Sequence, residues 1–448
     1  MRELLIDAAE RAIRYQEGLS GRAIAPDPAA VARLAKLDIP LPDHPSEADE
    51  TLALLDSYGA ATMAMAGPRF FGFVIGGVLP VTLAANWLAG AWDQNTGLAT
   101  ITPLSAKLEE VALRWLRGVL GLPPETGVGF VTGATMANFT CLAAARHAVL
   151  VQAGWDVEAD GLFGAPEVTV VVGEEAHPTL FKSLGLAGFG RNRVVRVPVD
   201  RQGRMRADAF PTLSGPTIVC LQAGNVNSGA FDPAPEIIPR AKAANAWVHV
   251  DGAFGLWAAA AASKAHLMAG YDQADSWATD AHKYLNTPYD CGLAFVRSPD
   301  VLQAAMAVSA AYLPSSSTRD PSNFTPELSR RARGIEVWAA LHSLGRSGLA
   351  DLVERTCRYA ARFADGLRAA GYTILNEVVL NQVLVTFGDA ERTRRVIAGI
   401  QQDGTCWCGE TVWQGQTAMR ISVSSWATTG ADVERSLQAM IRVARELA

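Results

Sequence analysis

This sequence lacks three features: long apolar runs, a surplus of basic residues, and cysteines placed to form a disulfide framework. Its 39 lysines and arginines stand against 45 acidic residues, which gives a formal net charge of -6. Such a balance provides no basic surface for nucleic acid and no polybasic run for an anionic membrane. Apolar runs such as residues 254–262 are far shorter than the roughly 18 residues of a membrane-spanning helix. We therefore expect neither nucleic acid nor a membrane as a partner.

Cysteine is scarce and scattered. The six cysteines lie in apolar surroundings, which favours buried reduced thiols over disulfides. Cys406 and Cys408 have no second pair of ligands nearby, so we expect no metal site. Residues 1–19 predict an amphipathic helix with charges throughout, without the apolar centre of a signal peptide. These features predict a cytoplasmic protein.

Apolar residues make up 49% of the chain, enough for an extensive core. From about residue 126 to residue 297, β-branched apolar runs alternate with helical segments and lack a strict polar alternation. This pattern is typical of a mostly parallel sheet covered by helices, where ligands bind beyond the carboxyl ends of the strands. The expected strands cover residues 128–132, 168–173, 194–199, 217–221, 247–250 and 292–296. From residue 332 onward helices mix with short strands, which predicts a smaller α+β domain.

A buried acid and a lysine stand out within residues 247–292. Asp251 follows the apolar run 247–250, where a carboxylate is costly unless a cation meets it. Lys283 lies among apolar neighbours, where desolvation would lower the pKa of its amine and make it a nucleophile toward aldehydes. Pyridoxal 5'-phosphate (PLP) requires both groups: a lysine that holds its aldehyde as a Schiff base, and an acid that faces its pyridine nitrogen. Singly, each would be an ordinary turn acid or surface lysine; together they predict a PLP site.

The surrounding motifs resemble those of the PLP-dependent group II amino-acid decarboxylases, the family of the aromatic-amino-acid, glutamate and histidine decarboxylases. The matching segments are His-Val-Asp-Gly-Ala-Phe at 249–254, Ala-Asp-Ser at 274–276, His-Lys at 282–283 and Asp-Cys at 290–291. The resemblance covers nearly the whole chain. It implies the α/β fold of the aspartate-aminotransferase-like PLP enzymes (fold type I), with a mostly parallel central sheet and a smaller C-terminal α+β domain.

The resemblance also implies a division into three parts. Residues 1–75 would form an N-terminal helical arm that wraps the partner subunit, residues 76–331 the large PLP-binding domain, and residues 332–448 the small domain. An arm of this kind has too little core to fold alone. We therefore expect a homodimer with shared active sites.

Further cofactor contacts follow from the resemblance. Residues 133–135 begin a helix whose N-terminus suits a phosphate and correspond to the family's phosphate loop, although alone they would indicate a simple cap. His177 and Ala253 take the positions that cover the two faces of the cofactor ring; without this context His177 would be an ordinary loop residue. The predicted cofactor-binding residues are Ala134, Thr135, His177, Asn225, Asp251, Ala253, Asp280, His282 and Lys283.

Two of these positions depart from the family pattern. Asn225 and Val226 replace two threonines, so a hydroxyl expected near the cofactor is missing, and Asn225 or Asn227 could substitute for it. Asp280 stands where the family usually has Asn or Ser near the phosphate, which adds an anion there. The departure at Asn225 and Val226 leaves room for other PLP reactions.

Catalytic and substrate-binding residues are assigned by the same resemblance. Tyr312 lies at the separation from Lys283 at which the family carries its catalytic tyrosine, whose phenol would protonate the carbon that has lost carbon dioxide. Family members with phenylalanine there tend toward aldehyde formation, so a tyrosine favours simple decarboxylation. Phe71, Phe73 and Trp92 are expected at the mouth of the substrate pocket.

The predicted function is PLP-dependent decarboxylation of an L-amino acid, with an aromatic one marginally favoured, to the amine and carbon dioxide. The substrate amine would displace Lys283, and Tyr312 or His177 would transfer the proton after carbon dioxide leaves. Arg420 lies in a strand where the family's arginine is commonly structural, although an arginine of this domain binds the substrate carboxylate in aminotransferases of the same fold. Two alternatives stay open: another PLP reaction on the same scaffold, such as transamination, aldehyde formation or carbon–carbon lysis, and a catalytically silent PLP-binding scaffold protein.

Overall fold

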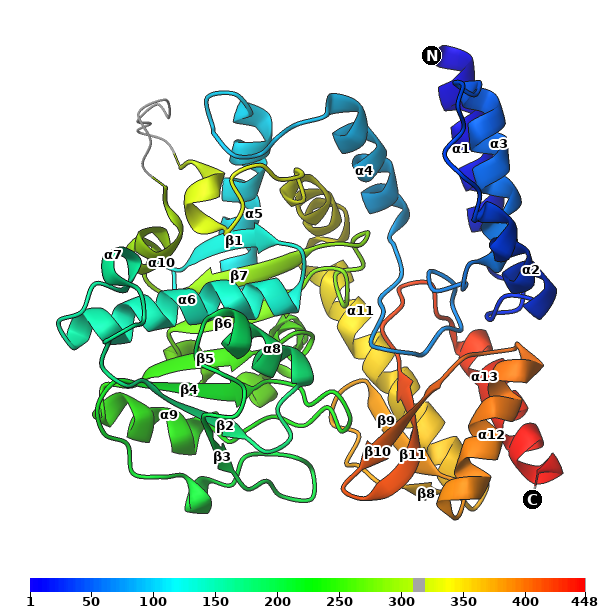
Figure 1. Cartoon of the computed structure of the whole chain (residues 1–448). Coiled ribbons are helices and arrows are strands. Elements are labelled where there is room, and N and C mark those ends of the chain that lie inside the picture. Colours follow the sequence, from blue (N-terminus) through cyan, green and yellow to red (C-terminus); the bar gives the residue numbers. More distant parts are fainter. Residues whose placement is uncertain (309–318, 448) are drawn as a thin grey trace.

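A seven-stranded sheet forms the centre of the larger part of the computed structural model, which describes residues 1–308 and 319–447 (Figure 1). In spatial order its strands are β1 (Gly127–Val131), β7 (Gly292–Val296), β6 (Ser276–Asp280), β5 (Trp247–Asp251), β4 (Thr217–Gln222), β2 (Thr169–Gly173) and β3 (Val194–Val197). Strand β7 runs antiparallel to both of its neighbours, and all other neighbouring strands are parallel. The predicted mostly parallel sheet is confirmed.

Helices cover both faces of this sheet. The helices of this larger part are α4 (Pro80–Trp92), α5 (Pro103–Leu120), α6 (Ala134–Gln152), α7 (Val157–Asp160), α8 (Pro178–Leu186), α9 (Ala234–Ala243) and α10 (Pro299–Met306), of which α4 packs on α11 and α7 on α6. Successive side chains of a strand point to opposite faces, which divides the core in two. Val219 of β4 packs in one cluster with Ile237 of α9, and the next residue, Cys220, packs in another with Leu142 of α6. Helix α6 thereby lies across the middle of one face (Figure 1).

Strand β6 is absent from the predicted strands. Its sequence, Ser-Trp-Ala-Thr-Asp, contains small and polar residues instead of a β-branched run, yet all 5 residues are buried. It is held between β5 and β7, with which it shares its backbone hydrogen bonds. Long-range pairing therefore makes it a strand where local propensity does not.

A second sheet of four antiparallel strands lies in the C-terminal part (Figure 1). Its strands are, in spatial order, β10 (Gly409–Trp413), β11 (Gln416–Ser422), β9 (Gln382–Thr386) and β8 (Thr373–Ile374). The helices of this part are α11 (Gly334–Ala369), α12 (Ala390–Asp403) and α13 (Gly430–Glu446). Helix α11 kinks at Gly345, where φ is 60°. It contacts α4 and α5 as well as β9, so it joins the two parts of the molecule.

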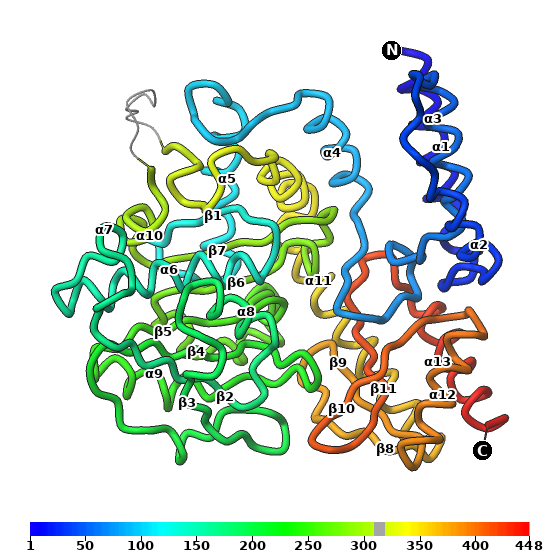
Figure 2. Tube along the Cα trace, in the orientation of Figure 1, coloured from blue at the N-terminus to red at the C-terminus, as the bar shows by residue number. Residues whose placement is uncertain are grey.

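The N-terminal arm stands apart from both sheets (Figure 2). Helices α1 (Arg2–Gly18), α2 (Pro28–Ala32) and α3 (Ala48–Ser57) contain no buried residue. Their exposed apolar side chains include Leu54, 51% exposed, and Leu55, 71% exposed. The wrapping of a partner subunit by this arm stays a prediction, as do the domain boundaries at residues 75 and 331.

Two expectations from composition concern cysteines and membrane spans. All six cysteines lie in the described part of the chain, and each is buried and free. Among the described residues, no helix combines the length and the apolar character that crossing a membrane requires. The cytoplasmic location stays a prediction.

Candidate active site

A cavity of about 200 Å³ opens at the carboxyl ends of the central strands, where the sequence predicts ligand binding. It lies between the turn that joins β1 to α6, the end of β4, and the segments that follow β2, β5 and β6. Every predicted cofactor residue except Asn225 lines it. The lining residues are Gly133, Ala134, Thr135, His177, Thr179, Gln222, Gly224, Val226, Asp251, Ala253, Phe254, Asp280, His282 and Lys283.

Asp251 is a buried acid at the last position of β5, and only 4% of it is exposed. Its carboxylate accepts hydrogen bonds from Asn138 Nδ2 at 3.2 Å and from the backbone N–H of Ala253 at 3.3 Å. Burial raises the pKa of Asp251, because the anion loses its solvation. A cationic ligand atom beside this carboxylate would restore its charged form.

Lys283 lies beside the carboxylate of Asp280, a contact that the sequence does not predict. Its Nζ lies 2.9 Å from Oδ2 of Asp280, the last residue of β6, and 5.9 Å from the centre of the Phe254 ring. The other oxygen of Asp280 accepts a hydrogen bond of 2.6 Å from the backbone N–H of Ala134. Asp280 therefore engages both the amine and the first amide of the predicted phosphate loop.

The turn between β1 and α6 packs directly on β7. A Cβ atom added to Gly292 would lie 2.5 Å from the backbone of Gly133, which is closer than real Cβ atoms come. Gly292 therefore has to be glycine for this close approach. The approach places the N-terminus of α6, with Ala134 and Thr135, at the edge of the cavity.

His177 forms the wall that follows β2 and acts as the N-cap of α8. Its Nδ1 accepts a hydrogen bond from the backbone N–H of Thr179 at 3.3 Å and lies 2.6 Å from the Thr179 hydroxyl. Burial lowers the pKa of His177. A neutral imidazole with a fixed ring plane is suited to stack on an aromatic ligand, and Ala253 lines the same cavity.

These groups fit PLP. Lys283 offers an amine for its aldehyde, Asp251 an anion for its ring nitrogen, and His177 and Ala253 two walls for its ring. The amides at the start of α6 suit a phosphate, with Asp280 as an additional anion beside them.

Asn225 does not reach the cavity, contrary to its predicted contact with the cofactor. It is 1% exposed, and its Nδ2 donates to Gln222 Oε1 at 3.0 Å. Its Oδ1 accepts from the backbone N–H groups of Asn227 and Ser228. The amide therefore holds its own loop together, and the neighbouring Val226 lines the cavity instead.

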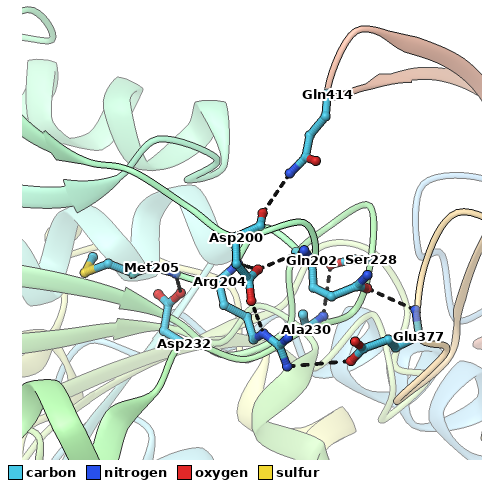
Figure 3. A network of polar contacts seen from close by, with 9 residues as sticks. All are labelled: Asp200, Gln202, Arg204, Met205, Ser228, Ala230, Asp232, Glu377 and Gln414. Atoms are coloured by element: carbon cyan, nitrogen blue, oxygen red, sulfur yellow. Dashed lines mark hydrogen bonds and ion pairs between the residues drawn. The ribbon is translucent and has the colours of Figure 1, made fainter. Parts of the chain in front are cut away.

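Polar contacts tie this loop to the small domain (Figure 3). Ser228 Oγ donates to the backbone oxygen of Gln202 at 2.6 Å, and Gln202 Oε1 accepts from the backbone N–H of Glu377 at 3.0 Å. Gln414 Nε2 donates to the backbone oxygen of Asp200 at 2.8 Å. The loop before α9 is thus positioned by groups from both parts of the molecule.

The predicted substrate residues do not line the cavity in the described chain. Phe71 is 1% exposed and packs edge-on against Phe363 at 5.0 Å, so its ring belongs to the core of the small domain and is unavailable for substrate. Phe73 and Trp92 are exposed, and Phe73 stacks on Trp407. Tyr312 lies outside the described residues.

Five lining residues have no predicted contact with the cofactor or the substrate: Thr179, Gln222, Gly224, Val226 and Phe254. Thr179 carries a detectable signal, because a hydroxyl two residues after a histidine at a helix start can bond to its ring. Phe254 lies inside the quoted motif 249–254 but was not assigned a role. Gln222 directly follows the predicted strand 217–221 and is the last residue of β4.

Comparisons with known proteins were consistent with one another. A family model described as the pyridoxal-dependent decarboxylase conserved domain matches residues 36–387. Tryptophan decarboxylase 1 of Oryza sativa subsp. japonica is 28% identical over 403 residues, which cover 80% of this chain and 77% of that protein. L-2,4-diaminobutyrate decarboxylase of Rhizobium meliloti (strain 1021) is 28% identical over 387 residues, which cover 82% and 75%.

The fold was compared with solved structures as well. The crystal structure of Oryza sativa TDC with PLP and tryptamine superposes with a TM-score of 0.90 at 23% identity and covers 99% of this chain and 97% of that one. The predicted fold is therefore confirmed.

Proposed function

Because the chain belongs to the pyridoxal-dependent decarboxylase family, we propose that it removes the carboxylate of an aromatic L-amino acid as carbon dioxide and releases the amine. It is a PLP-dependent carboxy-lyase that acts on an amino acid, and PLP is its cofactor. The aromatic side chain of the substrate and the roles of individual residues are the proposed parts.

The chemistry of the cavity wall carries the proposal. The relatives differ in substrate, since by their names one acts on tryptophan and another on 2,4-diaminobutyrate. Asp251 and Asp280 are the only carboxylates among the lining residues, and each already has partners within the protein. A second ammonium group would therefore find no free carboxylate there, whereas Val226 and Phe254 offer apolar surface to an aromatic ring.

An acidic side chain is the second candidate, because of Arg420 on β11. Its Nη1 donates to the backbone oxygen of Val226 at 3.2 Å, directly behind the cavity wall. Burial lowers the pKa of Arg420. No ion pair joins Arg420 to an acidic residue within the described part of the chain. A substrate carboxylate at the small-domain side of the cavity could supply that partner.

Bound PLP supplies an electron-withdrawing ring that accepts the electron pair left by the departing carbon dioxide. We infer that Lys283 would bind the aldehyde carbon of PLP and that Asp280, whose Oδ2 lies 2.9 Å from Nζ, would orient the amine of Lys283 when that amine is free. Asp251 keeps a proton at the ring nitrogen, and His177, neutral and fixed by Thr179, keeps the ring plane aligned. Tyr312 stays the predicted proton donor to the substrate carbon.

A substrate screen tests the proposal. The purified protein, loaded with PLP, is supplied separately with L-tryptophan, L-tyrosine, L-2,4-diaminobutyrate and L-glutamate, and carbon dioxide and amine are measured. We expect kcat/KM for an aromatic substrate to exceed that for the others by at least about tenfold, the scale on which apolar pockets discriminate. Lys283→Ala should abolish turnover.

The same screen separates the alternatives. Oxygen consumption with aldehyde, or dependence on a keto acid, would indicate another PLP reaction. Amine from glutamate or diaminobutyrate alone would contradict the aromatic proposal, and turnover of none of the four would favour a silent scaffold protein.

A further inference from the structure

A row of buried polar side chains leads away from Asp251 along one face of the sheet. Trp247, His249 and Asp251 alternate along β5, so all three point toward the same face. Helix α6 covers that face and contributes Asn138, and the adjacent strand β6 contributes Ser276. The site described above uses only the carboxylate at the end of this row.

Four short contacts connect the row. Asn138 Nδ2 lies 3.2 Å from Asp251 Oδ2, and Asn138 Oδ1 lies 2.8 Å from His249 Nε2. His249 Nδ1 lies 2.9 Å from Ser276 Oγ, and Trp247 Nε1 lies 2.9 Å from the same hydroxyl. Asn138, His249 and Ser276 are all 0% exposed, so water does not compete for these bonds.

The donor of each bond follows from the chemistry of the partners. Asn138 turns its Nδ2 toward Asp251 and its Oδ1 toward His249, so it donates an amide N–H to the carboxylate and accepts from the imidazole. Burial lowers the pKa of His249 to about 3, so the imidazole is neutral, with its one proton on Nε2. Its Nδ1 then accepts from the Ser276 hydroxyl, which itself accepts from the indole N–H of Trp247. All four bonds therefore point in one direction and end on Asp251.

We propose that Asn138, with His249 and Ser276 behind it, is a positioning residue that keeps Asp251 ionised and thereby keeps the ring nitrogen of bound PLP protonated. Hydrogen bonds aligned head to tail polarise one another, and this row places its positive end at the carboxylate. It opposes the effect of burial, which by itself favours the neutral acid. This proposal rests on PLP as the cofactor and not on the identity of the substrate. It can therefore fail while the proposed aromatic substrate holds, and the reverse is also possible.

Other titratable groups also face Asp251. His177 approaches from the start of α8 and Lys283 from the segment after β6, and both act on the charge of Asp251. Cys141 of α6 and Cys220 of β4 lie near it as thiols whose pKa burial raises, so they stay uncharged. None of the four belongs to the row, and all four are unchanged in the variants below.

The test follows the protonation of the ring nitrogen directly. Wild type and variants are loaded with PLP that carries ¹⁵N in its ring, and the ¹⁵N chemical shift is measured across the pH range in which each protein stays folded. We expect Asn138→Ala to move the resonance toward that of an unprotonated pyridine and to raise the PLP dissociation constant on the order of tenfold, as loss of a hydrogen bond to a charged group does. Ser276→Ala should move it in the same direction by less.

Two further variants separate this role from a structural one. Thr140→Val alters a fully buried residue of α6 whose hydroxyl bonds to the Met136 backbone, outside the row, and should leave the resonance at the wild-type position. His249→Gln keeps an N–H donor and should retain most of the wild-type shift. An unmoved resonance in Asn138→Ala, or an equal movement in Thr140→Val, overturns the proposal. If Asn138→Ala does not fold, an unmoved resonance in Ser276→Ala overturns it.

Discussion

Asp280 places a negative charge where the cofactor phosphate is expected. Its two oxygens hold the backbone N–H of Ala134 at 2.6 Å and the amine of Lys283 at 2.9 Å. These are the groups that a phosphate at the start of α6 and an aldehyde at the lysine would use. The carboxylate therefore competes with the phosphate for the amide and repels it as a like charge.

Replacing Asp280 by asparagine removes this charge while it keeps the size of the side chain. We expect Asp280→Asn to lower the PLP dissociation constant by roughly three- to tenfold, the range of about 1 kcal/mol for a partly screened like-charge contact. The constant is measured by titrating the visible absorbance of the bound cofactor. Asp290→Asn is the matched control, because Asp290 pairs with Arg333 and does not line the cavity. Weaker binding in Asp280→Asn would show that the acid supports the phosphate.

How far the candidate site can be predicted from sequence differs from residue to residue. Asp251 and Lys283 were predictable because a buried charge has few structural explanations, and both line the cavity. Phe71 is buried for a reason that the motif does not reveal, which is the pairing of its backbone. Its N–H donates to Trp407 O and its oxygen accepts from Ser422 N, as in a strand added to the small domain, and this pairing turns its ring into the core.

At the scale of elements, strands of the central sheet could be predicted only where the local sequence contains an apolar, β-branched run. The apolar runs that correspond to β4 and β5 are buried and β-branched, so local sequence suffices. Strand β6 has no such run, and its pairing with β5 and β7 depends on residues far along the chain. Asn138 was missed for the same reason, because its partner Asp251 lies on another element.

The turn after β4 is held in place by hydrogen bonds to Asp232, a buried acid whose charged form is disfavoured by burial. Asp232 accepts from the backbone N–H of Met205 at 2.7 Å (Figure 3). It also accepts from the backbone N–H of Gln222 at 2.6 Å. Burial raises its pKa from 3.8 to about 6. A carboxyl group that binds its proton more tightly in the folded state stabilises that state at low pH, and this contribution is lost as the pH rises from about 4 to about 6.

The pH dependence of unfolding tests this element. Between pH of about 4 and about 7, the free energy of unfolding of the wild type should fall by up to about 3 kcal/mol relative to that of Asp232→Asn. It is measured by urea denaturation at several pH values. Asp200 contributes in the opposite direction and at lower pH, because hydrogen bonds from Arg204 lower its pKa despite its partial burial. Its stabilising contribution is present above about pH 4 and is lost as the pH falls further, so Asp200→Asn should change the pH dependence only below about pH 4. A difference between wild type and Asp232→Asn that does not change with pH would contradict the expectation.

At the scale of the whole molecule, the N-terminal arm carries apolar side chains that nothing covers within the described part of one chain. Helix α3 keeps Leu54 and Leu55 exposed at 51% and 71%. If the arm wraps a second subunit as the family resemblance implies, these side chains are covered in the dimer.

Charging this surface tests the homodimer. We expect the double variant Leu54→Glu, Leu55→Glu to change the mass measured by light scattering from that of two chains to that of one, with an unchanged circular dichroism spectrum. Glu50→Gln on the same helix is the control and should keep the wild-type mass. A wild type with the mass of one chain, or a double variant that remains a dimer, would contradict the wrapping arm.

The position of β1 at the edge of the central sheet bears on how the protein is made. Within residues 1–308 and 319–447 it pairs with β7 alone, with Gly127 opposite Val296, so the strand that leads into the cofactor turn pairs with the last strand of the sheet to be synthesised. At translation rates of about 5–20 residues per second, β1 waits on the order of ten seconds for its partner. During that time its edge is open to wrong pairing, and Gly133 lacks the packing of Gly292. A nascent chain can therefore acquire its cofactor only late in synthesis, and chaperone protection matters most before β7 emerges from the ribosome.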